Sequence, residues 1–128
     1  MSAMSNYLEN EILDHILGTG AYTMPSAVYV GLSTGSFGDD NSGTELSGGG
    51  YARVAATFNA AASGTADNAS AIQFSAATGS WGTVSHFGIF DASTGGNLLI
   101  HGAFTTAKTI ASGDILKIDA GDLDISAD

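Results

Sequence analysis

Hydrophobic and polar positions follow two different periods along this chain, a helical period in residues 1–20 and a period of two in residues 26–126. The apolar residues of the first segment recur at helical spacing, at Met4, Tyr7, Leu8, Ile12, Leu13, Ile16 and Leu17. Ser5 or Asn6 can cap the start of this helix, and Gly18 can end it. The pattern predicts one N-terminal α-helix, whose broad apolar side must pack on the sheet or on a neighbouring subunit.

Residues 26–126 consist of short stretches of alternating character that are separated by turns rich in Gly, Ser and Asp. These stretches predict strands at residues 27–34, 51–60, 71–75, 81–91, 97–106, 114–119 and 123–126. Short strands at such intervals are typical of an antiparallel β-sandwich or a small barrel. The predicted fold class is mainly β with one N-terminal helix, and the length predicts a single domain, residues 1–128.

The clearest strand is 81–91, because it carries apolar residues at both parities. Strict alternation places Phe87 and Ile89 on one face of this strand and Val84 and Phe90 on the other. A strand that is apolar on both faces is central in a sheet or lies between two layers.

Two longer segments lack this alternation. Residues 35–50 are rich in Gly, Ser and Asp and end in Gly48-Gly49-Gly50, and a loop of this length is often an interaction element. Residues 60–71 have low complexity and are interpreted as a loop between strands.

Charge is scarce and strongly unbalanced. Charged residues make up 12% of the chain, about half the usual fraction. The cations are Arg53, Lys108 and Lys117, and with thirteen carboxylates they give a net charge of −10. This balance argues against binding to nucleic acids and to anionic membranes. A surface of small, uncharged residues is expected to be covered by neighbouring subunits.

The absence of cysteine excludes disulfides, thiolate metal sites and cysteine nucleophiles, and it suits assembly in a reducing cytosol. The first residues lack the basic start and the apolar stretch of a signal peptide. No apolar run approaches the ~20 residues of a transmembrane helix.

Catalytic chemistry has little support in the sequence. His86 and Asp91 are five residues apart on one predicted strand and therefore face opposite sides, and no nucleophile elbow is present. His101 has no predicted partner, and His15 lies near the end of the predicted helix. The glycine run 48–50 lacks the Lys-Ser/Thr ending of a phosphate-binding loop. We expect no catalytic and no cofactor-binding residues.

Calcium is the one cofactor that the sequence leaves open. Residues 39–45 gather oxygen ligands, but Gly43 stands where an EF-hand needs a ligand and Gly50 replaces its closing Glu. A second acidic cluster consists of Asp119, Asp122 and Asp124. Solvated turn aspartates are the favoured interpretation of both clusters, so no metal-binding residues are predicted.

Four blocks of this sequence resemble a family of small bacteriophage structural proteins. The blocks are SNYLENEILDH at 5–15, YVGLS at 29–33, GGGYAR at 48–53 and WGTVSHFGIFD at 81–91, and the similarity extends over residues 5–125. Members are commonly labelled tail-fibre-like or tail proteins, and the resemblance implies a virion protein. Small β-rich trimers in virions also serve as capsid cement, so the resemblance implies a homotrimer as well.

Several residues are candidates for contacts between subunits or for docking on the particle: Tyr7, Leu8, Ile12, Gly49, Gly50, Tyr51 and Arg53. Arg53 is a lone cation among carboxylates, which suggests a buried or intersubunit ion pair, with an exposed strand arginine as the alternative. Trp81 and Phe87 are expected in the core.

These features predict a non-enzymatic virion structural protein. A capsid decoration or cement role is favoured over a tail-fibre role, because 128 residues show neither repeats nor a coiled coil for a stalk. The expected partners are other copies of the chain and the major capsid protein, or alternatively tail proteins. The expected location is the outer surface of the virion after assembly in the host cytoplasm. A small metal-dependent or hydrolytic enzyme is the remaining alternative.

Overall fold

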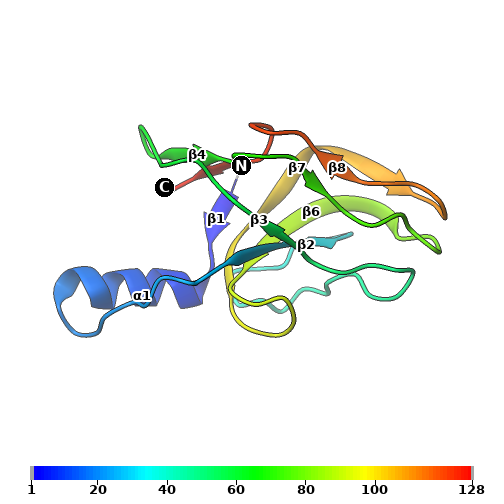
Figure 1. The fold of residues 1–128 in the computed structure, drawn as a ribbon. Helices are drawn as coiled ribbons and strands as arrows, with labels where there is room; N and C mark the ends of the chain where they lie inside the picture. The colour runs from blue at the N-terminus through cyan, green and yellow to red at the C-terminus, as the bar shows by residue number, and fades with distance from the viewer. Residues whose placement is uncertain (1, 128) are drawn as a thin grey trace.

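The computed structural model describes residues 2–127 and is mainly β with one helix near its start (Figure 1). The elements are β1 (Ser2–Met4), α1 (Asn6–Leu17), β2 (Val28–Ser33), β3 (Val54–Ala56), β4 (Thr65–Asp67), β5 (Ile72–Gln73), β6 (Gly82–Phe90), β7 (Leu98–Ile110), β8 (Lys117–Ile118) and β9 (Asp124–Ser126). The predicted fold class is confirmed. No helix of the described chain is long and apolar enough to cross a bilayer.

Five strands form one antiparallel sheet in the order β1-β7-β6-β2-β3. Two small antiparallel ladders, β4-β9 and β5-β8, complete the described strands. The main sheet begins at β1 and ends at β3, so it is open and not a closed barrel. The ladders lie across one face of this sheet, and the arrangement is sandwich-like (Figure 1).

The core lies between the main sheet and the two ladders. Its sheet side is formed by Val30, Leu32, Val84, Phe87, Ile89 and Ile110. Its other side is formed by Ile72, Phe74, Leu116, Ile118, Leu123 and Ile125. Trp81 and Phe87 are buried, as predicted from the sequence. A smaller cluster of Phe37, Phe90 and Leu98 occupies a second site, where Phe37 meets Phe90 edge to face.

The predicted faces of strand 81–91 were wrong for Val84. This side chain belongs to the main core with Phe87 and Ile89, whereas Phe90 packs in the second cluster. The β6-β7 register shifts between Val84 and His86. Two steps along β6, from Val84 to His86, face five steps along β7, from Lys108 to Ala103, so strict alternation of the side chains fails at this irregularity.

The boundaries of several elements differ from the predictions. Residues 60–71 were interpreted as a loop but contain β4, and β1 was not predicted at all. Met4, which was assigned to the helical stripe, ends β1 instead. β3 and β8 are shorter than predicted, and β7 continues to Ile110. β1 and β4 have three residues each and show no apolar alternation, and pairing with β7 and β9 makes them strands.

Both ends of the helix follow local rules. Ser5 is the N-cap, with its Oγ accepting from the backbone N–H of Leu8 at 3.2 Å and donating to the carbonyl of Leu98. Gly18 closes the helix in the left-handed region at φ 80°. The cap therefore also ties the start of the helix to the first residue of β7.

Asn68 joins the ladders through one buried amide. Its Nδ2 donates to the carbonyls of Ser70 and Asp119, both at 2.9 Å, and its Oδ1 accepts from the N–H of Leu123 at 2.9 Å. The side chain is only 1% exposed. Removal of the amide takes this partner from the Ser70 carbonyl and the Leu123 N–H, whereas the Asp119 carbonyl still accepts from the N–H of Asp122 at 3.1 Å.

We expect Asn68→Ala to lower the free energy of unfolding by about 1–3 kcal/mol, because it leaves buried backbone groups unpaired. Urea titration followed by circular dichroism measures the loss. The matched control is Asn59→Ala, whose exposed amide donates to Asp67 at 2.8 Å; this change should stay within about 0.5 kcal/mol. Equal losses in both variants would show that the buried amide has no special structural role.

Candidate functional site

Helix α1 projects from the edge of the sandwich with most of its apolar face bare (Figure 1). Leu8 is the one buried residue among the helix positions. Leu13 is more than half exposed, and Ile16 and Leu17 are 73% and 72% exposed. The sequence pattern predicted that either the sheet or a neighbouring subunit covers this apolar face. Within the described chain, the sheet covers only the base of the helix.

The chain returns along another side of the helix and leaves the apolar face open. The backbone N–H of Tyr22 donates to Nδ1 of His15 at 3.1 Å. Partial burial raises the pKa of the Tyr22 hydroxyl, and nearby Tyr7 and the carboxylates of Asp91 and Glu11 raise it further. The returning segment therefore covers the side with Tyr7 and His15, not the side with Leu13 and Leu17.

A small apolar cavity lies at the base of the helix. Its volume is about 230 Å³, and its lining includes Leu8 and Ile12 from α1, Ile100 from β7, and Ala66 and Ile125 from the β4-β9 ladder. Leu8 anchors the helix there, whereas Ile12 is 36% exposed at its margin. Of the three helix residues proposed for docking, Leu8 thus has a structural contact, and Tyr7 and Ile12 lie nearer the surface.

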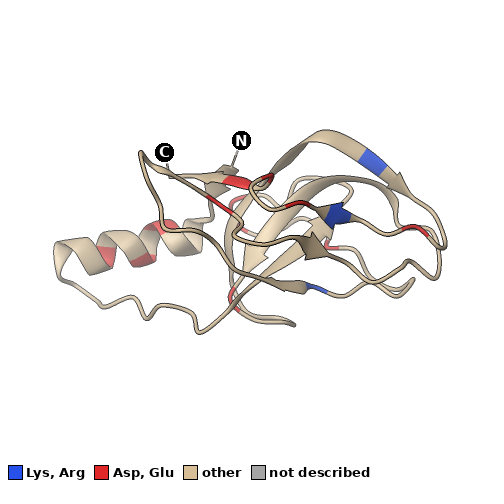
Figure 2. Ribbon diagram, turned by 45° about the horizontal axis from the view of Figure 1, so that its top comes forward, with Lys and Arg blue, Asp and Glu red and all other residues tan. Residues whose placement is uncertain are grey.

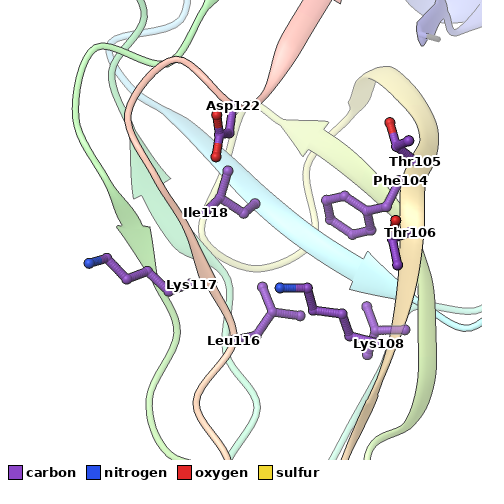
Figure 3. A pocket seen from close by; sticks show the side chains of 9 residues that line it. Phe104, Thr105, Thr106, Lys108, Leu116, Lys117, Ile118 and Asp122 are labelled. Carbon is purple, nitrogen blue, oxygen red and sulfur yellow. The ribbon is translucent and has the colours of Figure 1, made fainter.

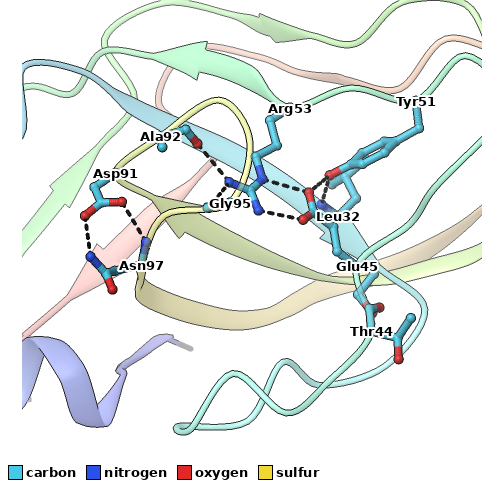
Figure 4. Close-up of polar contacts among 10 residues, drawn as sticks. Leu32, Thr44, Glu45, Tyr51, Arg53, Asp91, Ala92, Gly95 and Asn97 are labelled. Atoms are coloured by element: carbon cyan, nitrogen blue, oxygen red, sulfur yellow. Dashed lines mark hydrogen bonds and ion pairs between the residues drawn. The ribbon is translucent and has the colours of Figure 1, made fainter.

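Arg53 lies at the centre of a largely buried polar cluster (Figure 4). Its Nε and Nη2 donate to the two carboxylate oxygens of Glu45 at 2.9 and 2.7 Å, the bidentate geometry that Arg favours. Its Nη1 donates to the carbonyls of Ala92 and Gly95, both at 2.8 Å. The guanidinium carbon lies 3.6 Å from the ring centre of Phe90. The exposed alternative for Arg53 is therefore wrong.

Tyr51 joins this cluster to the core. Its hydroxyl donates to Glu45 and accepts from the N–H of Leu32 at 2.9 Å. Burial raises the pKa of the Tyr51 hydroxyl far above its ordinary value, and the hydrogen bond to the Glu45 carboxylate raises it further. The ring stacks on Phe74 and meets Trp81 edge to face. Both effects favour the protonated phenol, which donates to Glu45.

The glycine run makes a tight turn against Trp81. The carbonyl of Gly49 accepts from Trp81 Nε1 at 2.8 Å and from the N–H of Thr78 at 2.9 Å. Gly49 has φ 58°, and a Cβ at this position would lie 3.1 Å from the indole. Gly50 lies as closely against Thr78. Gly49, Gly50, Tyr51 and Arg53 thus all make contacts within their own chain; contacts with a neighbour stay a prediction for them.

The histidines form no catalytic constellation in the described chain. His86 Nδ1 lies 2.7 Å from Oγ of its neighbour Ser85, and no carboxylate contacts the other ring nitrogen. His101 does have a partner, which the sequence did not reveal: its Nε2 lies 2.7 Å from Oδ1 of Asp39. That pair links β7 to the loop that follows β2, across 62 positions in sequence. A Ser-His pair without an orienting acid lacks the geometry for nucleophilic catalysis.

The loop that was weighed for calcium uses its oxygens within the chain. Asp40 Oδ1 accepts from the N–H of Ser42 at 3.1 Å, and hydrogen bonds from Ser42 lower the pKa of the Asp40 carboxyl. Asp39 contacts His101 and Glu45 contacts Arg53. Across residues 2–127, no three His, Asp or Glu side chains converge as metal ligands would.

Comparison with known proteins gives one family. The family described as "Podophage GP4 fiber I protein gp80" matches residues 3–126, nearly the whole chain. No curated protein sequence matches the chain significantly. The four sequence blocks that resembled phage structural proteins all lie within the matched range. The chain belongs to the podophage GP4 fiber I protein gp80 family, a family of phage virion structural proteins.

Proposed function

We propose that this virion structural protein is a non-enzymatic fibre subunit that works through contacts between copies and with other proteins of the particle. The description of its family supports the fibre assignment. The observation that carries the subunit role is the bare apolar face of α1, with Ile16 and Leu17 both more than 70% exposed. An isolated soluble domain gains nothing from such a face, whereas a subunit buries it on assembly.

A capsid decoration protein is the second candidate. Its support is the compact shape of residues 2–127, which contain a 12-residue helix and no long stalk-forming element. A compact domain suits attachment at many equivalent sites on a shell, where weak individual contacts add up. In both candidate functions, the apolar face of α1 is buried on assembly. The two functions differ in the location of the protein on the particle and in its number of copies.

The proposed partners follow from the assembly role. They are other copies of the chain in a homotrimer, together with tail proteins for a fibre or the major capsid protein for a decoration protein. The proposed location is the outer surface of the virion, reached by assembly in the host cytoplasm. Nucleic acid and membrane are not proposed as partners, because the net charge of −10 opposes binding to anionic polymers and surfaces.

Quantitative mass spectrometry of purified virions tests the proposal. For a fibre subunit, we expect a copy number close to that of the tail proteins, and for a decoration protein one close to that of the major capsid protein. Absence of the chain from purified particles would contradict both assignments.

The copy number in virions of a variant with a changed helix face tests whether this face makes the assembly contact. Ile16→Asp places a charge on a side chain that is 73% exposed, so folding should be preserved while incorporation falls at least tenfold. The combined change of Leu8→Asp and Ile12→Asp is less specific, since Leu8 is buried and its replacement also undoes the base of the helix. Wild-type incorporation of Ile16→Asp would remove the helix face from the assembly contact.

A further inference from the structure

A second surface of the molecule is concave and carries positive charge, whereas the bare helix face is convex and carries the carboxylate of Glu9. A groove lies between β7 and β8, with a volume of about 270 Å³ (Figure 3). Its apolar lining consists of Val84, Phe104, Leu116 and Ile118. This groove is too small for a whole helix, but it accepts apolar side chains from one edge of a helix that lies along it.

The groove is also where the exposed positive charge of the chain is found. Arg53 is buried and paired with Glu45, and both remaining cations, Lys108 and Lys117, line the groove (Figure 2). Lys117 makes only an exposed contact of 3.5 Å with Asp119, and Lys108 makes no ion pair among residues 2–127. Lys108 reaches from β7 toward the β8 side of the groove in Figure 3. Asp122 is the one acid in the lining.

The bare helix face complements this groove in apolar character and in charge. Glu9 precedes Ile12 by three residues and Leu13 by four, so its carboxylate lies on the apolar face that continues to Ile16 and Leu17. Glu11 and Asp14 lie on the other side of the helix, the side of Tyr7, and do not belong to this face. An apolar helix face with one carboxylate, Glu9, therefore matches an apolar groove with lysines along its margins.

The helix cannot reach the groove of its own chain. In Figure 1, α1 and the β7-β8 region lie on opposite sides of the sandwich, and α1 packs only on β1 and the beginning of β7. β7 pairs with β1 through residues 100–102, and beyond Gly102 it has no second strand neighbour in the described chain. A helix is one of the elements that cover such an open edge in natural proteins.

We propose that helix α1 of one copy docks in the β7-β8 groove of the next copy, with Glu9 facing Lys108. This inference refines the proposed assembly role by naming the two surfaces that meet. The contact is head to tail, because different surfaces of the two copies meet. Such contacts close into a ring when the rotation between copies allows it, and closure after three copies gives the proposed homotrimer.

A symmetric helix-to-helix contact fits the charges less well. It would bring the Glu9 carboxylates of the two copies onto one interface with no basic residue beside them, because His15 lies on the side of Tyr7. Like charges at an interface are repulsive, and exposed lysines would be left unused. The head-to-tail contact places opposite charges together.

Sedimentation of the purified full-length chain tests the contact without other phage proteins. We expect the wild type to sediment as a trimer, of about three times 12.8 kDa. Ile16→Asp removes the helix surface and Lys108→Glu changes the groove, and each variant alone should sediment as a monomer. The control is Met24→Asp, which charges an apolar residue that is 82% exposed but lies outside both surfaces; it should stay trimeric.

Mixing the two defective variants identifies the type of contact. The intact helix of the Lys108→Glu variant can dock in the intact groove of the Ile16→Asp variant, so the 1:1 mixture should form a dimer and no larger species. A symmetric helix contact predicts no species in the mixture beyond those of the separate variants, and this result would overturn the proposal. So would a monomeric wild type, or a Lys108→Glu variant that stays trimeric by itself.

Charge exchange provides an independent readout. Glu9→Lys should weaken association at least tenfold, and combining it with Lys108→Glu should restore most of the loss. Added salt should weaken the wild-type trimer, because it screens exposed charges. No restoration in the double variant would contradict the pairing of these two residues. Since these measurements use the isolated chain, their failure leaves the virion copy number, and hence the structural role itself, as a separate result.

Discussion

Replacement of Arg53 by Ala is expected to lower the free energy of unfolding by about 3–5 kcal/mol. The guanidinium is 8% exposed, pairs with both carboxylate oxygens of Glu45 and holds the carbonyls of Ala92 and Gly95. The variant leaves the Glu45 carboxylate without its cation and removes the stacking on Phe90. Urea titrations of the two proteins, followed by near-ultraviolet circular dichroism, measure the difference.

The matched control is the ion pair of Lys117 with Asp119, the other pair that a lysine or arginine makes among the described residues. Lys117→Ala removes an exposed contact with Asp119 at 3.5 Å, and such pairs contribute about 0–1 kcal/mol. Arg53→Lys separates charge from geometry, since a lysine keeps the charge but cannot form the bidentate contact. We expect it to retain only part of the wild-type stability. Arg53→Ala with the stability of Lys117→Ala would refute the structural role of the cluster.

Truncation of Phe74 to Ala should also cost about 3–5 kcal/mol, by a different mechanism. Phe74 is 1% exposed and stacks on Tyr51, and it meets Trp81 edge to face. Its removal leaves a cavity beneath the two aromatic residues that support the glycine turn and the Glu45 cluster. Thermal unfolding and urea titration should both report the loss.

Phe58→Ala is the appropriate comparison, because this ring is only partly buried and lies at the margin of the core. The same truncation should cost clearly less there, since solvent and neighbouring side chains fill the space. Similar losses at the two positions would mean that the core between the sheet and the ladders is not closely packed around Phe74.

The stretches with regularly spaced apolar residues predicted the structure well. The helix begins after Ser5 and ends before Gly18, two of the signals that were read from the sequence. Alternation in β2 placed Val30 and Leu32 in the core, where both are fully buried. These elements were predictable because each carries enough apolar residues to reveal which face is buried.

Other features depend on contacts that are remote in sequence. β4 carries the residues Thr-Ala-Asp, which have no strand pattern, and it exists because β9 pairs with it. The bulge after Val84 places that side chain in the main core, and the local alternation of apolar and polar residues does not predict it. A central strand with few polar residues tolerates such a shift, since both of its faces are covered.

The candidate site was predictable in part. The isolation of Arg53 among carboxylates predicted an ion pair. Its partner Glu45 is one of thirteen carboxylates, and the sequence does not single it out. The helix stripe was visible, whereas its exposure was not, because hydrophobic spacing alone does not tell which surface covers a face. The groove between β7 and β8 combines residues from segments that were predicted separately, and only their arrangement in space reveals it.

The first and last described strands meet at one corner of the molecule. The N–H of Ser126 donates to Oγ of Ser2 at 2.9 Å, and both ends lie near the base of α1 in Figure 1. A fluorophore or gold label attached beside Ser2 or beside Ser126 would therefore report the same position on an assembled particle. A label in the turn around residues 93–96, which lies beside Arg53, would mark a different part of each copy. Comparing two such labels in electron micrographs would give the orientation of every copy relative to the axis of the virion.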